Sequence, residues 1–210
     1  MKIYNNMIIN KLTFIRRFTF ALIMMLISVN LWGQELPTLS LQDPSAAYNA
    51  DTNPYVVTSA EDWGKLASDV AGGYSYSEKV IKLTANITVS EMVGVLDYYD
   101  VEKNKPFSGT FDGNNDTLTF NKGTDGEPFE DYFCAPFRCT DGALIQNLTV
   151  NGTINTSSGT MSGLIGYNDF TTARNTVVDS VVVCVNLICT EEWYYAEGGC
   201  FAVYGEDISL

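Results

Sequence analysis

The chain has 210 residues, 46% of them hydrophobic, and carries 25 acidic against 12 basic residues. This composition supplies one sizeable core, while a formal net charge of −13 disfavours binding to nucleic acids or to anionic lipid surfaces. The sequence contains no histidine, which excludes serine-histidine and cysteine-histidine nucleophile systems and removes the commonest general base.

Residues 1–33 have the order of an export signal. Their basic residues lie between Lys2 and Arg17, an apolar segment covers 18–29, and small Gly33 precedes position 34. A membrane-spanning helix needs about 20 apolar residues, and this run is shorter. We therefore expect a cleaved signal peptide and a secreted or cell-surface protein without a stable membrane span. A retained membrane anchor is the alternative.

A spacer and a helix are predicted next. Residues 34–54 are polar, contain three prolines and show no periodicity, which is typical of a flexible spacer. A helix is predicted over 59–71, with Ser59 as N-cap, Asp62 three residues later, and two glycines directly after its end. Its apolar face consists of Trp63, Leu66, Ala67 and Val70. We expect this helix to cover the open first turn of a solenoid.

The remainder of the chain, from residue 80 onward, is a series of β-rich segments that recur. The first apolar residues of four copies, used as anchors, are Leu118, Ile145, Val178 and Ile208. Their intervals of 27, 33 and 30 residues are typical of stacked supersecondary units. The residues three places before the anchors are Asn115, Gly142, Asn175 and Gly205. These residue types predict a recurring left-handed corner.

The repeats also predict which residues stack. We expect parallel strands in which Ile145 lies near Val178 and Val178 near Ile208, with further inward positions three and five residues after each anchor. Polar pairs at 146–147 and 179–180 interrupt the alternation, which predicts a bend or bulge. The sequence stops within the last predicted strand, so we expect a domain truncated at its C-terminal end and completed by further β-helix turns or by another subunit.

Several segments carry a resemblance to a known family. They are Trp63-Gly64-Lys65-Leu66-Ala67, Val80-Ile81-Lys82-Leu83-Thr84-Ala85-Asn86-Ile87, Phe107-Ser108-Gly109-Thr110-Phe111-Asp112-Gly113-Asn114 and Gly163-Leu164-Ile165-Gly166. The first three resemble the opening of exported bacterial repeat proteins of the GLUG-motif type, and the last matches the motif that names them. Related copies of this motif are predicted at 135–138, where both glycines are replaced, and at 199–202.

The resemblance covers roughly residues 55–210. It implies an all-β, right-handed parallel β-helix on or outside the cell surface, adhesin-like, with the helix over 59–71 as its N-terminal cap. It supplies no catalytic residues. A β-sandwich is the alternative fold.

All five cysteines lie in the second half of the chain. They are Cys134, Cys139, Cys184, Cys189 and Cys200. Their spacing is unlike that of a four-thiolate zinc site. We expect buried thiols on the inner faces of strands, as for Cys184 after three valines. A disulfide in the exported protein is the alternative.

Two groups of residues are candidate sites. Asp112, Asn114 and Asp116 have the one-three-five spacing of a calcium loop, but Gly123 stands where a glutamate is expected. A β-turn between two strands explains the same residues. The candidate sugar site combines carboxylates with stacking rings at Glu191, Glu192, Trp193, Tyr194 and Tyr195. An exposed loop is the alternative there.

The sequence favours a non-catalytic exported surface module that contacts a glycan or a protein through loops. We assign no catalytic residue and, calcium apart, no cofactor. The alternative is a polysaccharide-degrading lyase or glycosidase. Lyase-type β-helices rely on basic residues, and only Arg138 and Arg174 follow Lys122 in this chain.

Overall fold

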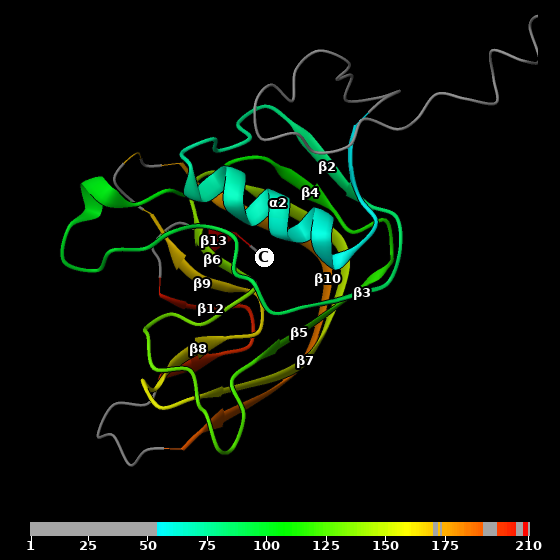
Figure 1. Cartoon of the computed structure of the whole chain (residues 1–210). Coiled ribbons are helices and arrows are strands. Elements are labelled where there is room, and N and C mark those ends of the chain that lie inside the picture. Colours follow the sequence, from blue (N-terminus) through cyan, green and yellow to red (C-terminus); the bar gives the residue numbers. More distant parts are fainter. Residues whose placement is uncertain (1–53, 170–171, 173, 191–196, 205–207, 210) are drawn as a thin grey trace, which may run out of the picture. The chain divides into compact units, whose positions relative to one another are not determined.

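A computed structural model describes residues 54–169, 172, 174–190, 197–204 and 208–209. The predicted signal peptide and nearly all of the predicted spacer lie outside these residues. The described part is a parallel β-solenoid of about three turns, with the helix α2 (Ala60–Ala71) lying across its first turn (Figure 1). Every pair of named strands is parallel, so the predicted β-helix is confirmed and the β-sandwich is excluded.

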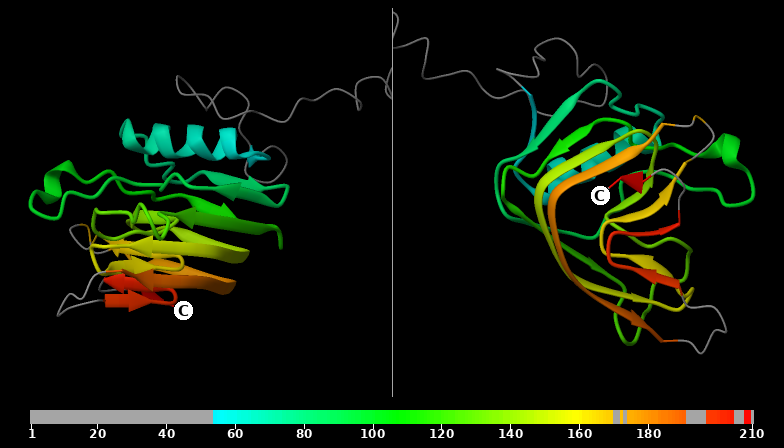
Figure 2. Two further views of the ribbon diagram at one scale, coloured as in Figure 1. Left: turned by 60° about the horizontal axis from the view of Figure 1, so that its bottom comes forward. Right: turned by 180° about the vertical axis from the view of Figure 1, so that it is seen from behind.

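The strands follow one another around successive coils. In chain order they are β1 (Tyr55–Val57), β2 (Val80–Leu83), β3 (Ile87–Val89), β4 (Thr110–Asp112), β5 (Thr117–Lys122), β6 (Phe137–Thr140), β7 (Leu144–Thr156), β8 (Thr160–Ser162), β9 (Ile165–Asn168), β10 (Thr176–Cys189), β11 (Glu197–Gly199), β12 (Ala202–Tyr204) and β13 (Ile208–Ser209), with the 3-10 helix η1 (Val101–Lys103) between β3 and β4. Figure 2 shows the coils stacked in chain order, with α2 at one end of the stack.

The long strands β7 and β10 each run along two faces of the solenoid. The first part of β7 pairs with β4 and a later part pairs with β5, while β10 follows β7 along almost its whole length. A third face consists of β6, β9 and β12. Because both bending strands are continuous, adjacent faces are joined without a loop.

One column of inward residues runs through the stack. It consists of Tyr55, Ile81, Phe111, Ile145 and Val178, each paired with the next. None of the five is more than 5% exposed. Their steps of 26, 30, 34 and 33 residues agree with the period predicted for stacked units. The predicted stacking of Ile145 on Val178 is confirmed.

The first predicted anchor is wrong. Leu118 pairs with Val150 rather than with Ile145, whose partner in the preceding coil is Phe111. In that coil residues 113–116 separate β4 from β5, so Leu118 begins the second face and not the first. Each face starts with an apolar residue after a polar corner, and the pattern alone does not distinguish the faces.

The last predicted anchor is also wrong. Ile208 pairs with Thr176, so its predicted stacking on Val178 is out by two residues. Thr176 is fully buried, and its hydroxyl lies 2.7 Å from Oδ1 of Asn168. A polar residue therefore occupies an interior position here, which an apolar pattern does not indicate.

The predicted bends within the long strands are confirmed. Asn147 and Ser180 have φ angles of 51° and 55°, in the left-handed region. They are the residues that interrupt the paired register of β7 and β10. These residues turn both strands from the first face onto the second.

The predicted corner before each anchor is present in part. Asn115 and Gly142 both have a φ of 65°, but Asn175 does not have a positive φ, and Gly205 lies outside the described residues. Seven residues separate β9 from β10, against three between β6 and β7. The segment before β10 is therefore longer than the one before β7, and Asn175 does not form the predicted left-handed corner.

The helix forms as predicted, with one change at its N-terminus. The N–H of Asp62 donates to the Ser59 hydroxyl at 3.2 Å, whereas the Asp62 carboxylate accepts from the backbone and hydroxyl of Thr58 at 3.0 and 2.7 Å. Burial by itself would raise the pKa of Asp62, but these hydrogen bonds and nearby Lys65 hold it below its usual value. The helix start is thus fixed by Thr58 and Ser59 together.

Trp63 inserts from α2 into the interior of the solenoid. Its side chain is fully buried, and its ring lies 5.7 Å from that of Phe111 and 5.5 Å from that of Phe137. The indole N–H donates to the carbonyl of Glu91 at 2.8 Å. The predicted face of α2 is buried, so the helix covers the first coil.

The Gly163-Leu164-Ile165-Gly166 motif marks two close approaches between coils. Leu164 and Ile165 are fully buried. A Cβ at Gly163 would lie 2.6 Å from the carbonyl oxygen of Cys200, and one at Gly166 would lie 2.7 Å from that of Phe133. These positions have no room for a side chain, and the motif therefore combines two buried residues with two inter-coil contacts.

The other copies of this motif are mostly in the predicted register. Phe137 pairs with Ile165, which confirms the copy at 135–138. The copy at 199–202 is one residue out, since Gly199 pairs with Ser162. A further copy at 91–94 was not predicted, and its Val93 pairs with Phe137.

The cysteines only partly follow the prediction. Cys134 and Cys139 are fully buried, and burial raises the pKa of the Cys134 thiol to about 12. Cys184 and Cys200 are exposed, so their predicted burial is wrong. At Cys184 the reason is that Val183 points inward and the next residue on the strand points outward. Cys134, Cys139, Cys184 and Cys200 are free thiols.

We predict that Val178→Asp prevents cooperative folding, whereas Val182→Asp on the same strand is tolerated. Val178 is 5% exposed and Val182 is 55% exposed. Burial of valine contributes about 2 kcal/mol, and a buried unpaired carboxylate costs more than that loss. Circular dichroism and thermal unfolding of both variants measure the difference. Similar unfolding curves for the two variants would contradict the observed register.

Candidate functional site

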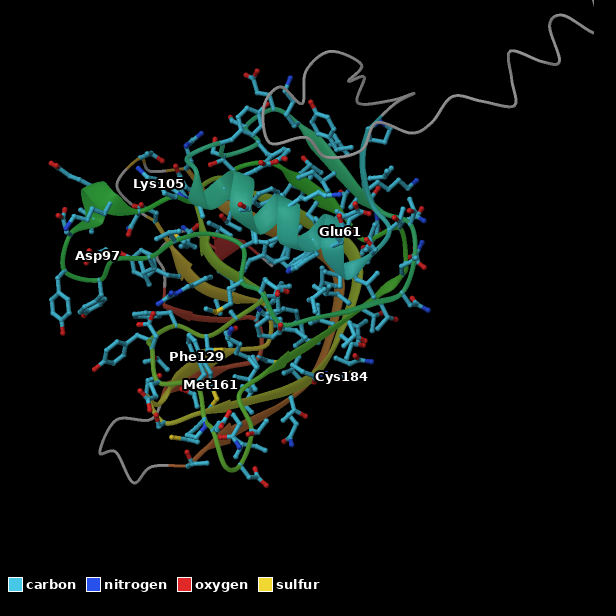
Figure 3. The ribbon with its side chains drawn as sticks, viewed as in Figure 1. Glu61, Asp97, Lys105, Phe129, Met161 and Cys184 are labelled. Carbon is cyan, nitrogen blue, oxygen red and sulfur yellow. The ribbon has the colours of Figure 1, made fainter. Side chains whose placement is uncertain are left out.

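A groove of about 410 Å³ lies on one flank of the solenoid. Its walls are the loop 95–105, which carries η1, and the segment 131–138 that leads into β6. The loop stands out from the stacked coils in Figure 1, and Figure 3 shows Asp97 and Lys105 on it. We call this site the tyrosine groove, because Tyr98, Tyr99 and Tyr132 line it.

A backbone bridge closes the loop 95–105 at its base, and a tight turn at Asp97 begins it. Val95 and Lys105 form an antiparallel bridge, with N–H to carbonyl distances of 3.0 and 2.9 Å. The Asp97 carboxylate accepts from the backbone N–H groups of Tyr99 and Asp100 at 3.1 and 3.0 Å, a local turn that aspartate favours. This geometry fixes the backbone that carries Tyr98 and Tyr99.

A buried amide ties the loop to the solenoid. Asn104 is 7% exposed; its Oδ1 accepts from the N–H of Asp97 at 2.8 Å, and its Nδ2 donates to the carboxylate of Asp169 at 3.2 Å. Asp169 is 4% exposed, and its N–H donates to the carbonyl of Thr140. The loop is therefore anchored to the third face of two successive coils.

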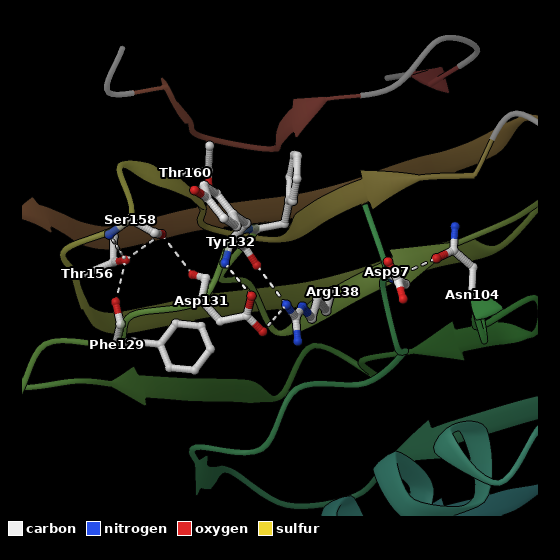
Figure 4. A network of polar contacts seen from close by, with 10 residues as sticks. Asp97, Asn104, Phe129, Asp131, Tyr132, Arg138, Thr156, Ser158 and Thr160 are labelled. Carbon is white, nitrogen blue, oxygen red and sulfur yellow. Dashed lines mark hydrogen bonds and ion pairs between the residues drawn. The ribbon is translucent and has the colours of Figure 1, made fainter. Parts of the chain in front are cut away.

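The opposite wall is held by the next coil. The N–H of Phe133 donates to the Thr160 hydroxyl at 3.0 Å, and the Ser158 hydroxyl donates to the carbonyl of Asp131 at 2.8 Å (Figure 4). Thr156 donates to the carbonyl of Phe129 at 2.7 Å. Phe133 has a φ of 56°, and these contacts hold its strained backbone in place.

Arg138 supplies a cation at the edge of the groove. It occupies the position of Gly166 in the repeat, one residue after the pair of Phe137 with Ile165. Its side chain is 13% exposed, forms an ion pair with Asp131 and donates to the carbonyl of Tyr132 at 3.0 Å. The replacement of a motif glycine thus leaves the coil register intact and places a guanidinium beside the groove.

Aromatic rings provide the apolar surface of the groove. The Tyr98 ring stacks on that of Phe133 with centroids 5.7 Å apart, and Tyr99 lies edge-on to Tyr98 at 5.6 Å. Tyr98, Tyr99 and Tyr132 are 56%, 88% and 45% exposed. Beneath them Phe133 belongs to a small buried cluster with Leu96, Cys139 and Tyr167. Exposed rings therefore rest on a packed base.

The charges of the groove are balanced by one another. Lys103 lies 2.9 Å from Asp100 and 3.7 Å from Asp97. The hydrogen bond from Lys103 lowers the pKa of Asp100, and the same contact raises that of Lys103. The charged residues that line the groove are Asp97, Lys103, Asp131 and Arg138, and their formal charges sum to zero.

The calcium candidates lie together on the turn between β4 and β5. Asp112 accepts from the N–H of Asn114 at 2.9 Å and from the amide of Asn147 at 3.1 Å, and Asn114 donates to Asp116 at 3.4 Å. This is the bonding of the alternative β-turn. No group of three or more His, Cys, Asp or Glu among the described residues could hold a metal ion. Nothing in these contacts tests calcium binding, which was a candidate beside the β-turn and not an assigned site.

The candidate sugar site Glu191, Glu192, Trp193, Tyr194 and Tyr195 lies outside the described residues. The tyrosine groove was not predicted as a site. In the sequence, Tyr98 and Tyr99 indicate an exposed loop. No sequence pattern indicates that Arg138, 40 residues after Tyr98, lies in the same groove.

Comparisons with known proteins give no match, since no family model, curated protein sequence or solved structure is similar to the chain.

We predict that Asn104→Ala loosens the loop while Lys103→Ala does not. The first change removes two buried hydrogen bonds, which lowers the free energy of local opening by about 1–3 kcal/mol. The second removes ion pairs whose lysine is 67% exposed, and such pairs contribute little. Hydrogen exchange of the loop amides in both variants measures the effect. Unchanged exchange in Asn104→Ala would show that Asn104 does not anchor the loop.

Proposed function

We propose that the chain is a non-catalytic, exported surface module that contacts a glycan or a protein through the tyrosine groove. The observation that carries this proposal is a set of three exposed tyrosines that face one groove, two of them, Tyr98 and Tyr99, on a closed and anchored loop and Tyr132 on the opposite wall. Tyrosine offers a large contact area at a small cost in conformational entropy, and a fixed loop reduces the ordering cost of binding. The GLUG-type, adhesin-like assignment is part of the same proposal.

The bonding of the acidic groups favours binding over catalysis. Asp131 is held by Arg138 and by the N–H of Tyr132, and Asp97 is held by two backbone N–H groups and by Lys103. A glycosidase needs one carboxyl group as a proton donor and a second at a set separation across the scissile bond. Both of these lining carboxylates are instead engaged as hydrogen-bond acceptors and ion-pair partners, which suits a contact surface.

We predict that the purified chain binds members of a glycan and matrix-protein array and that Tyr98→Ala with Tyr132→Ala weakens this binding about tenfold or more, because stacking surface is lost. Tyr74→Ala is the matched control, since Tyr74 is 38% exposed and does not line the groove. A polysaccharide-cleavage assay runs beside the array. Turnover of a polysaccharide would instead establish the enzymatic alternative, and binding that survives the double substitution would place the contact elsewhere.

We further propose that residues 1–33 direct export and are removed. Within the described ranges no helix is both long and apolar enough to cross a membrane. Mass spectrometry of an exported fraction is expected to find a chain that begins near Gln34. Recovery of residues 1–33 in the exported chain would refute cleavage.

We also propose that the outer edge of β10 accepts another strand, from a further β-helix turn or another subunit. Beyond Val177, no strand among the described residues pairs with this edge. Its inward residues Val181, Val183, Val185 and Leu187 are only partly buried. β10 carries one charged residue, Asp179, and an apolar edge with few charges favours strand pairing.

We predict that the chain associates with increasing concentration and that Val182→Lys suppresses this association. Val182 is 55% exposed on the outward side of β10, where a charge opposes edge pairing without entering the core. Sedimentation velocity over a range of concentrations measures the effect. A wild-type chain that stays monomeric at all concentrations would exclude self-association through this edge.

A further inference from the structure

We propose that the tyrosine groove takes a neutral oligosaccharide, with a pyranose ring on Tyr98 and its hydroxyl groups bonded to Asp131. This inference rests on the proposed binding function and names the class of ligand. It combines three observations: a supported aromatic ring, an exposed carboxylate in fixed orientation, and a groove whose charges cancel.

The stacking surface is provided by Tyr98. One side of its ring rests on Phe133, with an interplanar angle of 26°, and the side chain remains 56% exposed. A pyranose has an apolar C–H face and a rim of hydroxyl groups, so its ring covers an aromatic side chain while its edge stays polar. The support from Phe133 means that little side-chain freedom is lost on binding.

The hydrogen-bonding group is Asp131. Its side chain is 55% exposed; Oδ2 is held by Arg138, and Oδ1 accepts from the N–H of Tyr132 at 2.8 Å. A carboxylate oxygen accepts more than one hydrogen bond, and bonds from hydroxyl groups to a charged acceptor are strong. Arg138 is a positioning residue, because its side chain is largely covered and its terminal nitrogen bonds both Asp131 and the carbonyl of Tyr132.

The charge of the groove selects a neutral ligand. Lys103 and Arg138 are already paired with carboxylates, and Asp100 beside Lys103 adds a further negative charge to the neutral lining. The whole chain carries a formal charge of −13. An acidic saccharide would therefore meet repulsion without an unpaired cation to offset it.

The backbone of the loop favours a saccharide over a peptide. A peptide that adds as a strand needs a row of unpaired backbone groups. At the base of this loop Val95 and Lys105 use their N–H and carbonyl groups for each other. The polar contacts that the groove offers come instead from side chains such as Asp131 and Lys103, which suit the hydroxyl rim of a sugar.

The test is calorimetric titration of the full chain with three probes: a neutral glucose or mannose hexasaccharide, an oligogalacturonate of the same length, and a proline-rich peptide. We expect the neutral saccharides to bind and the affinity to change little with salt, because no net charge is neutralised. Asp131→Asn and Tyr98→Ala are each expected to weaken binding about tenfold, whereas Tyr98→Phe and the control Tyr74→Ala retain it. Thermal unfolding confirms that each variant is folded.

The outcomes separate this inference from the function on which it rests. Binding of the oligogalacturonate or the peptide that Tyr98→Ala abolishes would overturn the neutral-saccharide assignment and leave the groove as a contact site. Binding of the neutral probe that is unaffected by Tyr98→Ala and Asp131→Asn would overturn the assignment of the groove. If none of the probes binds, the neutral-saccharide inference is wrong, and the array then decides whether the groove has another ligand.

Discussion

The structure depends on one constraint: no coil of the solenoid can bury its own interior. Ile81, Phe111 and Ile145 lie in three successive coils, and each is fully buried because the coils on either side cover it. The parallel backbone pairing that sets this column also sets the position of every other face. At the first coil of the described residues, Trp63 from α2 fills the interior against Phe111 and Phe137.

The tyrosine groove takes its geometry from this stacking. One wall is the loop 95–105, fixed through Asn104 to Asp169, and the other contains Phe133, fixed to Thr160. Thr160 lies in β8 and Asp169 directly follows β9, so both anchors belong to the coil that also contains β7. The walls themselves come from earlier parts of the chain. A change in the register between coils would therefore separate the rings of the tyrosine groove from its charged groups.

Coverage of the interior falls towards β10. Ile145 and Val150 on β7 are fully buried, whereas Val183 and Val185 on β10 are only partly buried. The described part of β13 pairs with the first residues of β10 alone. Beyond Val177, the outer edge of β10 therefore has no paired strand among the described residues.

The sequence by itself determined two local features, because short-range patterns carry them: the capped helix with Trp63 on its apolar face and the bends in the long strands. The repeat period also predicted the stacking of Ile145 on Val178, where the spacing between coils is regular. Only the tertiary structure decided the pairing of Leu118 with Val150 and the meeting of Tyr98 with Arg138 in one groove. The reason is that coil corners differ in length, as between β4 and β5 and within β7. Which residues stack then depends on long-range backbone pairing and close packing, which no local pattern records.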